Sequence, residues 1–310
     1  MCCLFGIIDC GRTLTGRQKG QLVRALAAES EARGTDAAGV AYNSGGRLHI
    51  FKRPGAAHTL NFFVPEDARA VMGHSRLTTQ GNARCNRNNH PFAGAVPGVR
   101  FALAHNGVLY NDVLLKKDRK LPKTAIETDS YVAVQLLEQA AALTPASLKD
   151  MAESVEGSFV FTLLDERDHF WFVRGDNPLC LLHFPRLDLY VYASTQEILA
   201  LALKGLWLER EPGEAVPTEE GDILSIAPDG TRTLARFTPA EHSVFRCFVP
   251  GGYALRPAGP DRQYLCQLKR IAAAFGYSEQ EIEMLLHEGW TTDEIEEMLY
   301  SCSGLGRAYW

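Results

Sequence analysis

Short apolar segments of strand length recur along the first three-quarters of the chain and leave room for only a few long helices. Most are bounded by Gly, Pro, Asn, Asp or Ser, a pattern typical of β-strands. The predicted strands are 2–9, 40–43, 48–52, 71–75, 101–105, 159–164, 170–173, 180–183, 189–193, 223–226 and 233–237. Strands this short are stable only when they share a packed core, so the pattern predicts an α+β fold of stacked sheets covered by helices.

Two helices are predicted between these strands. One carries Leu22 and Leu26, which are four residues apart and therefore lie on one helical face. The other spans 131–143 and opens at Thr128-Asp129, whose side chains are suited to capping the first turn. The segment 44–46, Ser-Gly-Gly, is predicted to be the turn of a hairpin.

The character of the sequence changes after residue 237. Residues 238–260 are rich in Gly and Pro and are predicted to form a linker or a wrapping loop. Residues 261–310 are predicted to form a small three-helix unit. Its first helix is capped by Asp261, and the next two open with Ser/Thr-x-x-Glu capping boxes, Ser278 with Glu281 and Thr291 with Glu294. This unit is interpreted either as a cap that completes the core or as a docking module for another protein.

Composition narrows the class of function. The 32 basic and 37 acidic residues give a net charge of −5, which provides no footprint for nucleic acid or an anionic membrane. No apolar run approaches the ~20 residues that span a bilayer. The eight cysteines include no C-x-x-C pair, which argues against a zinc site or a disulfide lattice. A reducing cytoplasm is therefore the expected location.

The pair Met1-Cys2 can place a thiol and a free α-amine on one residue. Removal of Met1 would expose the amine of Cys2, which titrates near ~7.7–8.0 and can accept a proton at neutral pH. A nucleophile with its own base needs no separate histidine. A buried first strand would explain the same residues, so position alone leaves both interpretations open.

Several short motifs follow Cys2 in a fixed order. They are Cys2-x-x-x-Gly6, the segment 33–39 (RGTDAAG), Gly73-His74-Ser75-Arg76, Asn89-His90-Pro91-Phe92, Asn106-Gly107 and Thr128-Asp129-Ser130. Together they closely resemble the class II glutamine amidotransferase domain of the N-terminal nucleophile (Ntn) hydrolases. The resemblance runs over residues 2–237 and implies a four-layer αββα sandwich, to which 261–310 would add a small helical C-terminal appendage.

The resemblance implies roles for three catalytic residues. Cys2 would attack a side-chain amide, and its own amine would shuttle the proton. The Asn106 side-chain amide and the Gly107 backbone N–H would hold the oxyanion. The family usually has glycine after the nucleophile, and here Cys3 stands there. Its side chain would either crowd the site or supply a second thiol.

The same resemblance implies which residues would bind the α-carboxylate and α-ammonium groups of the substrate. Arg76 would bind the α-carboxylate with its planar fork, Thr79 would add a hydroxyl to that site, and Asp129 would hold the α-ammonium. The alternative is that Arg76 and Asp129 form a structural ion pair.

Other residues are expected to support the site. Arg33 and Asp36 are interpreted as loop organisers near the nucleophile, and His74 and His90 as hydrogen-bonding scaffold. The basic, amide-rich loop 84–89 has no assigned role.

The implied reaction is hydrolysis of glutamine to glutamate and ammonia through a thioester on Cys2, with no cofactor or metal. The residues after 237 are too few for an ammonia-accepting enzyme domain, so a separate protein is the expected acceptor, or else ammonia is released. Three alternatives remain. One is hydrolysis of a γ-glutamyl or other small amide, and another is a catalytically silent Ntn-fold subunit that binds partners. The third is an acylated scaffold that uses Cys2 and Cys3 as lipid sites.

Overall fold

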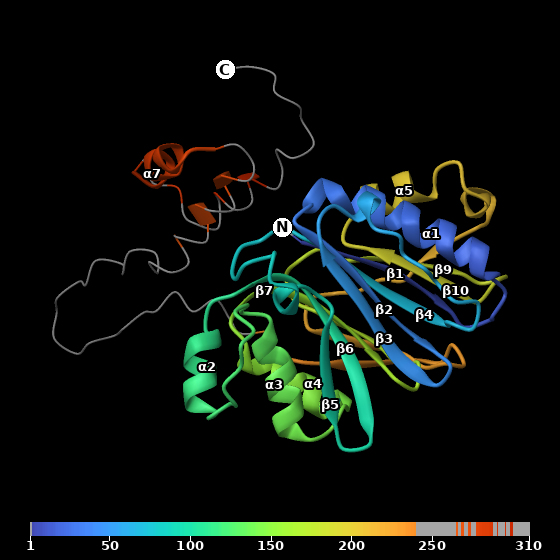
Figure 1. Ribbon diagram of the computed structural model, residues 1–310, viewed down its shortest axis with the longest axis horizontal. Helices are drawn as coiled ribbons and strands as arrows, with labels where there is room; N and C mark the ends of the chain where they lie inside the picture. The colour runs from blue at the N-terminus through green and yellow to red at the C-terminus, as the bar shows by residue number, and fades with distance from the viewer. Residues whose placement is uncertain are drawn as a thin grey trace. The chain divides into compact units, whose positions relative to one another are not determined.

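A computed structural model gives the fold of the chain (Figure 1). It describes residues 2–239, residues 277–287, and the single positions 265, 268, 269, 272, 273, 290, 295, 298 and 299. The chain divides into two compact units, Met1–Glu241 and His242–Trp310. The first unit contains all the candidate site residues.

Two antiparallel sheets form the centre of the first unit. The first sheet has the strand order β11 (Glu214–Ala215), β9 (Cys180–Phe184), β10 (Leu189–Ala193), β1 (Cys3–Asp9), β4 (Ala70–Arg76), β2 (Ala37–Ser44) and β3 (Arg47–Pro54). The second has the order β13 (Arg232–Arg236), β12 (Asp222–Ile226), β8 (Phe170–Arg174), β7 (Gly157–Asp165), β6 (Val99–Leu109) and β5 (Phe92–Val96). The N-terminal strand β1 is therefore an interior strand, paired with β10 and β4.

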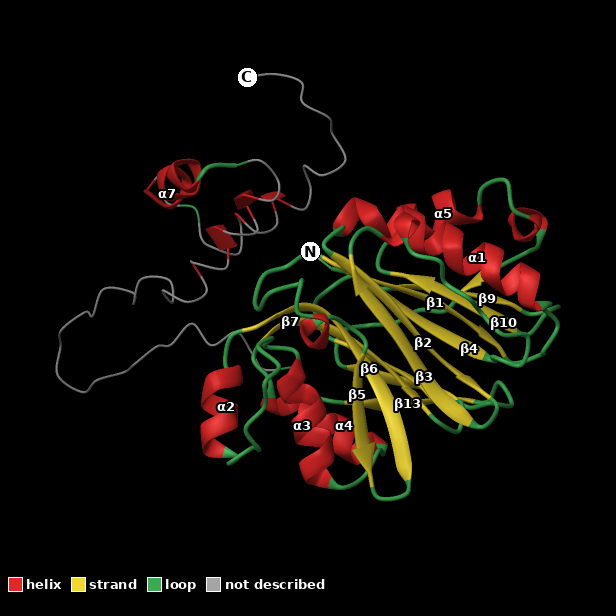
Figure 2. Ribbon diagram, in the orientation of Figure 1, coloured by secondary structure: helices red, strands yellow, loops and turns green. Residues whose placement is uncertain are grey.

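Helices cover the outer face of each sheet (Figure 2). The first sheet carries α1 (Gly16–Glu29) and α5 (Gln196–Leu203), and the second carries α3 (Tyr131–Ala140) and α4 (Pro145–Ser154). A further helix, α2 (Asp112–Asp118), follows β6 directly. Short 3₁₀ turns lie at Ser30–Arg33, Ala57–Thr59, Asn86–Asn88 and Trp207–Arg210. The result is the four-layer αββα sandwich of an α+β protein.

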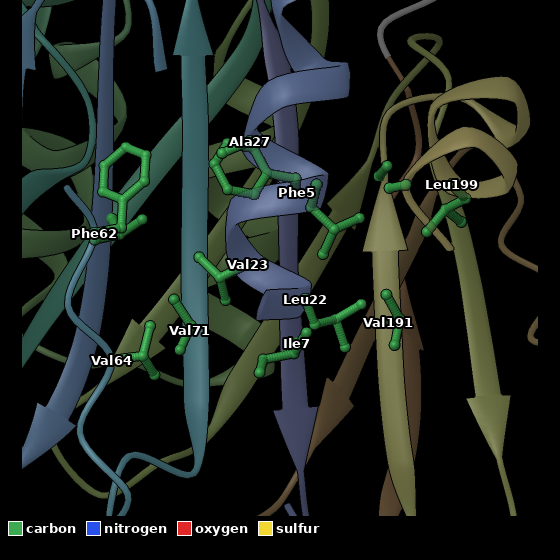
Figure 3. Close-up of a cluster of buried hydrophobic side chains, with 14 of the residues drawn as sticks. Phe5, Ile7, Leu22, Val23, Ala27, Phe62, Val64, Val71, Val191 and Leu199 are labelled. Carbon is green, nitrogen blue, oxygen red and sulfur yellow. The ribbon is translucent and has the colours of Figure 1, made fainter. Parts of the chain in front are cut away.

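Side chains alternate between the two faces of each strand, so each sheet packs against helices on one face and against the other sheet on the other. In β1, Phe5 and Ile7 pack under α1, whereas Leu4 and Ile8 pack in the cluster between the two sheets. Successive strand residues point to opposite faces, so a continuous apolar strand such as β1 must be covered on both sides. Figure 3 shows side chains of α1 against this outer face of the sheet, and labels Phe5, Ile7, Leu22, Val23, Ala27, Phe62, Val64, Val71, Val191 and Leu199.

Most predicted elements are present, with ends shifted by a few residues. All eleven predicted strands are found, and the 44–46 hairpin turn joins β2 to β3 with positive φ at Gly45 and Gly46. The strands β5 and β11 and the helices α2, α4 and α5 were not predicted. The capping prediction for Thr128-Asp129 is wrong. The N-cap of α3 is Ser130, which makes no side-chain capping hydrogen bond, and the Asp129 carboxylate accepts a hydrogen bond from the Leu109 N–H instead.

In the second unit, α7 (Glu279–His287) begins as predicted. Ser278 Oγ accepts a hydrogen bond from the Glu281 N–H at 3.3 Å, and the Glu281 carboxylate accepts one from the Ser278 N–H at 2.6 Å. The other elements predicted after Pro239, namely most of the 238–260 linker, the Asp261 cap and the Thr291–Glu294 box, lie outside the described residues. None of the described helices is both long and apolar enough to cross a bilayer.

Candidate active site

Cys2 lies immediately before β1, in the middle of the first sheet. Its side chain is 8% exposed, and its Sγ lies 3.5 Å from the carbonyl oxygen of Leu77. Cys3 is fully buried under α1 in the cluster that contains Phe5 and Ile7. Because neighbouring strand residues face opposite sides, the Cys3 side chain points away from the Cys2 side chain. Cys3 therefore fills the core and does not crowd the Cys2 side chain.

Residues 33–36 hold the chain around Cys2. The Arg33 Nε–H donates to the Cys2 carbonyl oxygen at 3.0 Å, and the Asp36 carboxylate accepts a hydrogen bond from the Thr78 N–H at 2.7 Å. A Cβ on Gly34 would lie 2.4 Å from the backbone nitrogen of Leu77, so only glycine permits this approach. Arg33 and Asp36 thus organise the loops beside the cysteine.

Burial determines the protonation state of the Cys2 thiol. Desolvation raises the pKa of the Cys2 thiol above its ordinary value, the Arg76 charge lowers that pKa, and the Asp129 charge raises it. A thiol in this setting is protonated at neutral pH, so it needs a base in order to react.

Arg76 ends β4 and is 2% exposed. Its Nη1 donates to Asn89 Oδ1 at 2.6 Å, and its Nη2 donates to the Gln80 carbonyl oxygen at 2.5 Å. Both acceptors are neutral, so the guanidinium keeps its full positive charge. Thr79 lies in the partly exposed loop that follows β4.

Asp129 lies just before α3 and is 4% exposed. Its Oδ2 accepts a hydrogen bond from the Leu109 N–H at 2.7 Å. Desolvation raises the pKa of Asp129 to about 6, against the lowering effect of its hydrogen bonds. Asp129 makes no ion pair within 4 Å with Arg76 or any other cation in the part of the chain that the structure describes. The structural ion-pair interpretation is therefore wrong.

Asn106 and Gly107 lie side by side in β6, in the second sheet. Gly107 has φ +141°, and a Cβ there would lie 1.8 Å from the carbonyl oxygen of Ser158. The fully buried Asn106 amide lies 3.4 Å from Ser194 Oγ, which also accepts a hydrogen bond from the Leu4 N–H at 2.9 Å. Ser194 thus joins the Asn106 side chain to β1, the strand that follows Cys2.

Three buried histidines, His74, His90 and His105, lie close to one another in this region. The rings of His74 and His90 stack with centroids 4.2 Å apart, and His74 Nε2 lies 3.0 Å from the His105 carbonyl oxygen. Desolvation lowers the pKa of His74 and His105 to about 3, and that of His90 well below its ordinary value. All three are therefore neutral at pH 7. His74 is hydrogen-bonded as predicted, whereas His90 contributes ring stacking, with neither ring nitrogen hydrogen-bonded within the described residues.

Sequence reasoning missed several residues of this neighbourhood. Ser194 follows strand 189–193 as an ordinary loop serine, and Asn177 donates from its side chain to the Asn106 carbonyl oxygen at 3.3 Å. Neither stands in a recognisable motif. Asn89 is the first residue of the motif Asn89-His90-Pro91-Phe92, but nothing in the sequence indicated that its side chain contacts Arg76.

A cysteine immediately before the central strand of an αββα sandwich, with the charges of Arg76 and Asp129 acting on it, is typical of the N-terminal nucleophile hydrolases. The comparisons with known proteins agree. Residues 74–200 match the sequence model of a glutamine amidotransferase domain. The glutamine–fructose-6-phosphate aminotransferase of Listeria innocua is 30% identical over 240 residues, and that of Halalkalibacterium halodurans is 31% identical over 207.

Among solved structures, the glutamine phosphoribosylpyrophosphate amidotransferase of B. subtilis has a similar fold. It has a TM-score of 0.61 and 22% sequence identity, and the match covers 76% of this chain and 49% of that one. The chain contains a class II glutamine amidotransferase domain. The aligned part is 73% of this chain but only 38% of the Listeria innocua enzyme, so the chain spans less than half the length of these relatives.

Proposed function

We propose that this protein hydrolyses the side-chain amide of glutamine to glutamate and ammonia, with Cys2 as nucleophile. One observation carries the proposal: Arg76 and Asp129 both act electrostatically on Cys2, yet neither neutralises the other through a direct ion pair. A positive and a negative side chain beside a nucleophile can bind a free amino acid, because its α-carboxylate is attracted to the arginine and its α-ammonium to the aspartate.

The headgroup would bind in one orientation. The fork of Arg76 and the hydroxyl of Thr79 receive the α-carboxylate, and Asp129 receives the α-ammonium. Asp129 must be ionised for this role. With a pKa of about 6 it is mostly ionised at pH 7, although burial opposes its charge.

The chemical step begins once Met1 has been removed and the α-amine of Cys2 is free. That amine takes the thiol proton while Sγ bonds to the amide carbon, which becomes tetrahedral. The Asn106 side-chain amide and the Gly107 N–H stabilise the oxyanion, an interaction for which loss of one donor typically costs ~10²–10³ in rate.

Collapse of this intermediate breaks the C–N bond. The same amine returns its proton to the leaving nitrogen, which departs as ammonia and leaves a thioester on Cys2. A water molecule then attacks the thioester carbon and gives a proton to the amine. Collapse of the second tetrahedral intermediate breaks the C–S bond, the amine returns the proton to Sγ, and glutamate leaves. Both half-reactions use one base and one oxyanion site.

We further propose that ammonia passes to a separate acceptor protein or escapes to solvent. We place the reaction in the cytoplasm, where reducing conditions keep a catalytic thiol free. Cys2, Cys3, Cys10, Cys85 and Cys180 are free thiols in the structure.

The test is ammonia release from glutamine by the purified protein, measured for the wild type, Cys2→Ala and Cys3→Ala. We expect loss of turnover in Cys2→Ala only, because Cys3 lies in the core. Retained turnover in Cys2→Ala would refute the assignment. Faster turnover of γ-glutamyl amides than of glutamine would refute the substrate.

A further inference from the structure

The loop 84–89, which had no role in the sequence interpretation, ends in two fully buried asparagines, Asn88 and Asn89. Buried amides are normally hydrogen-bonded, because a buried polar group without a partner destabilises the folded state. The partners of these two side chains therefore indicate what the loop is built to hold.

The orientation of the Asn89 amide is fixed from both ends. Its Nδ2 donates to the Ala83 carbonyl oxygen at 2.8 Å, and its Oδ1 accepts from Arg76 Nη1 at 2.6 Å. A guanidinium offers only donors and a carbonyl only accepts, so the reversed amide would lose both bonds. The Lys52 ammonium also holds the Asn89 main chain, through its carbonyl oxygen at 2.5 Å.

Asn88 holds the other side of the loop. Its Nδ2 donates to the Glu127 carboxylate at 2.8 Å, and its Oδ1 accepts from the Glu127 N–H at 3.0 Å. Glu127 lies two residues before Asp129. Two adjacent side chains of one loop therefore hold both parts of the proposed headgroup site. Asn89 binds Arg76, and Asn88 binds the segment that carries Asp129.

The neutrality of Asn89 matters as much as its geometry. Arg76 has five N–H donors, and within the described residues its side-chain hydrogen bonds go to neutral oxygens of Asn89 and Gln80, so its charge remains available for an anion. A carboxylate at position 89 would hold Arg76 equally well but would compete with the substrate for that charge.

We propose that Asn89 is a positioning residue that aims Arg76 and keeps its charge free, and thereby sets the affinity of the site for an α-carboxylate. The inference rests on the proposed function, in which Arg76 receives that group. It assigns Asn89 an effect on substrate binding and none on the chemistry at Cys2.

The test compares Asn89→Asp and Asn89→Ala with the wild type, using glutamine and glutamine α-amide, which lacks the carboxylate. We expect Asn89→Asp to raise the KM for glutamine at least about tenfold, the usual effect of a hydrogen bond to a charged group, with kcat within about twofold. The KM for the α-amide should stay within about twofold. Asn89→Ala should raise the KM for glutamine less, because it loosens Arg76 without neutralising it.

The matched control is Asn82→Asp, which adds the same charge at an exposed position two residues before the loop. Within the described residues, the Asn82 side chain makes one hydrogen bond, which it accepts from the Arg84 N–H. It should leave both KM values unchanged. Equal KM changes for the two substrates, or a fall in kcat alone, would overturn the proposal. Failure of both Asn89 variants to fold while Asn82→Asp folds would also overturn it, because Asn89 would then be structural. A wild type with no glutamine turnover would instead refute the proposed function.

Discussion

Acidification should weaken glutamine binding through Asp129. Burial raises the pKa of this carboxyl to about 6, so about nine-tenths is ionised at pH 7 and about one-tenth at pH 5. Only the ionised form attracts an α-ammonium. Glutamine stays zwitterionic over this range, and its ammonium keeps Asp129 ionised in the complex. The dissociation constant of glutamine should therefore rise about tenfold from pH 7 to pH 5.

The assay is calorimetric titration of glutamine into Cys2→Ala, which removes the thiol and prevents turnover. The matched control is the double variant Cys2→Ala with Asp129→Asn, which should bind weakly at both pH values, with no change between them. A dissociation constant that is equal at pH 7 and pH 5 in Cys2→Ala would refute the reasoning. So would the same tenfold rise in the double variant, because another group would then be titrating.

Three further predictions follow from burial and backbone geometry. Asp129→Asn should raise the free energy of unfolding at pH 7 by up to about 3 kcal/mol in urea titrations, because the folded pKa of about 6 exceeds the ordinary 3.8 and the cost of the buried charge is fully present only above pH 6. This gain should shrink as the pH falls from 6 and vanish below about pH 3, and an equal gain there would contradict this origin. Cys3→Ala should lower the free energy of unfolding by about 1 kcal/mol through lost core packing while glutamine turnover stays unchanged, and a lost turnover would place Cys3 in the reaction. Gly107→Ala should lower kcat by about 10²–10³. A Cβ at this position would lie 1.8 Å from the Ser158 carbonyl oxygen, so the backbone must shift and carry the N–H of residue 107 away from the oxyanion. An unchanged kcat would show that this N–H does not stabilise the oxyanion.

The sheets were predictable because the strand signal is local. The strand 189–193 is buried on both faces, so all of its residues are apolar. A continuous apolar run of this length can be recognised in the sequence as a strand. The missed strand β5 contains Gly94 and three alanines or valines, with only five residues to carry a signal. Its pairing with the long strand β6 stabilises it, and that is a tertiary effect.

The site was predictable only in part. Cys2, Arg76, Asn106 and Asp129 stand in short motifs whose order could be recognised. Thr128-Asp129 also had the residue types of a helix cap, and the local rule failed because the carboxylate bonds a strand 20 residues earlier.

The residues that support the site, Ser194 and Asn89, could not be recognised from a motif or a periodic pattern. Ser194 reaches Asn106 across 88 positions, and Asn89 reaches Arg76 through a loop fold that no periodicity describes. Contacts of this kind depend on how the two sheets and the loops between them meet.

The central claim is that the thiol and the α-amine belong to one terminal residue that captures an acyl group. The most direct measurement is the mass of the N-terminal peptide before and after exposure to an electrophilic glutamine analogue, such as its γ-diazoketone. The account predicts a peptide that begins at Cys2 and gains one adduct on that residue, with protection by glutamine. A peptide that retains Met1, or an adduct on any other cysteine, would contradict it.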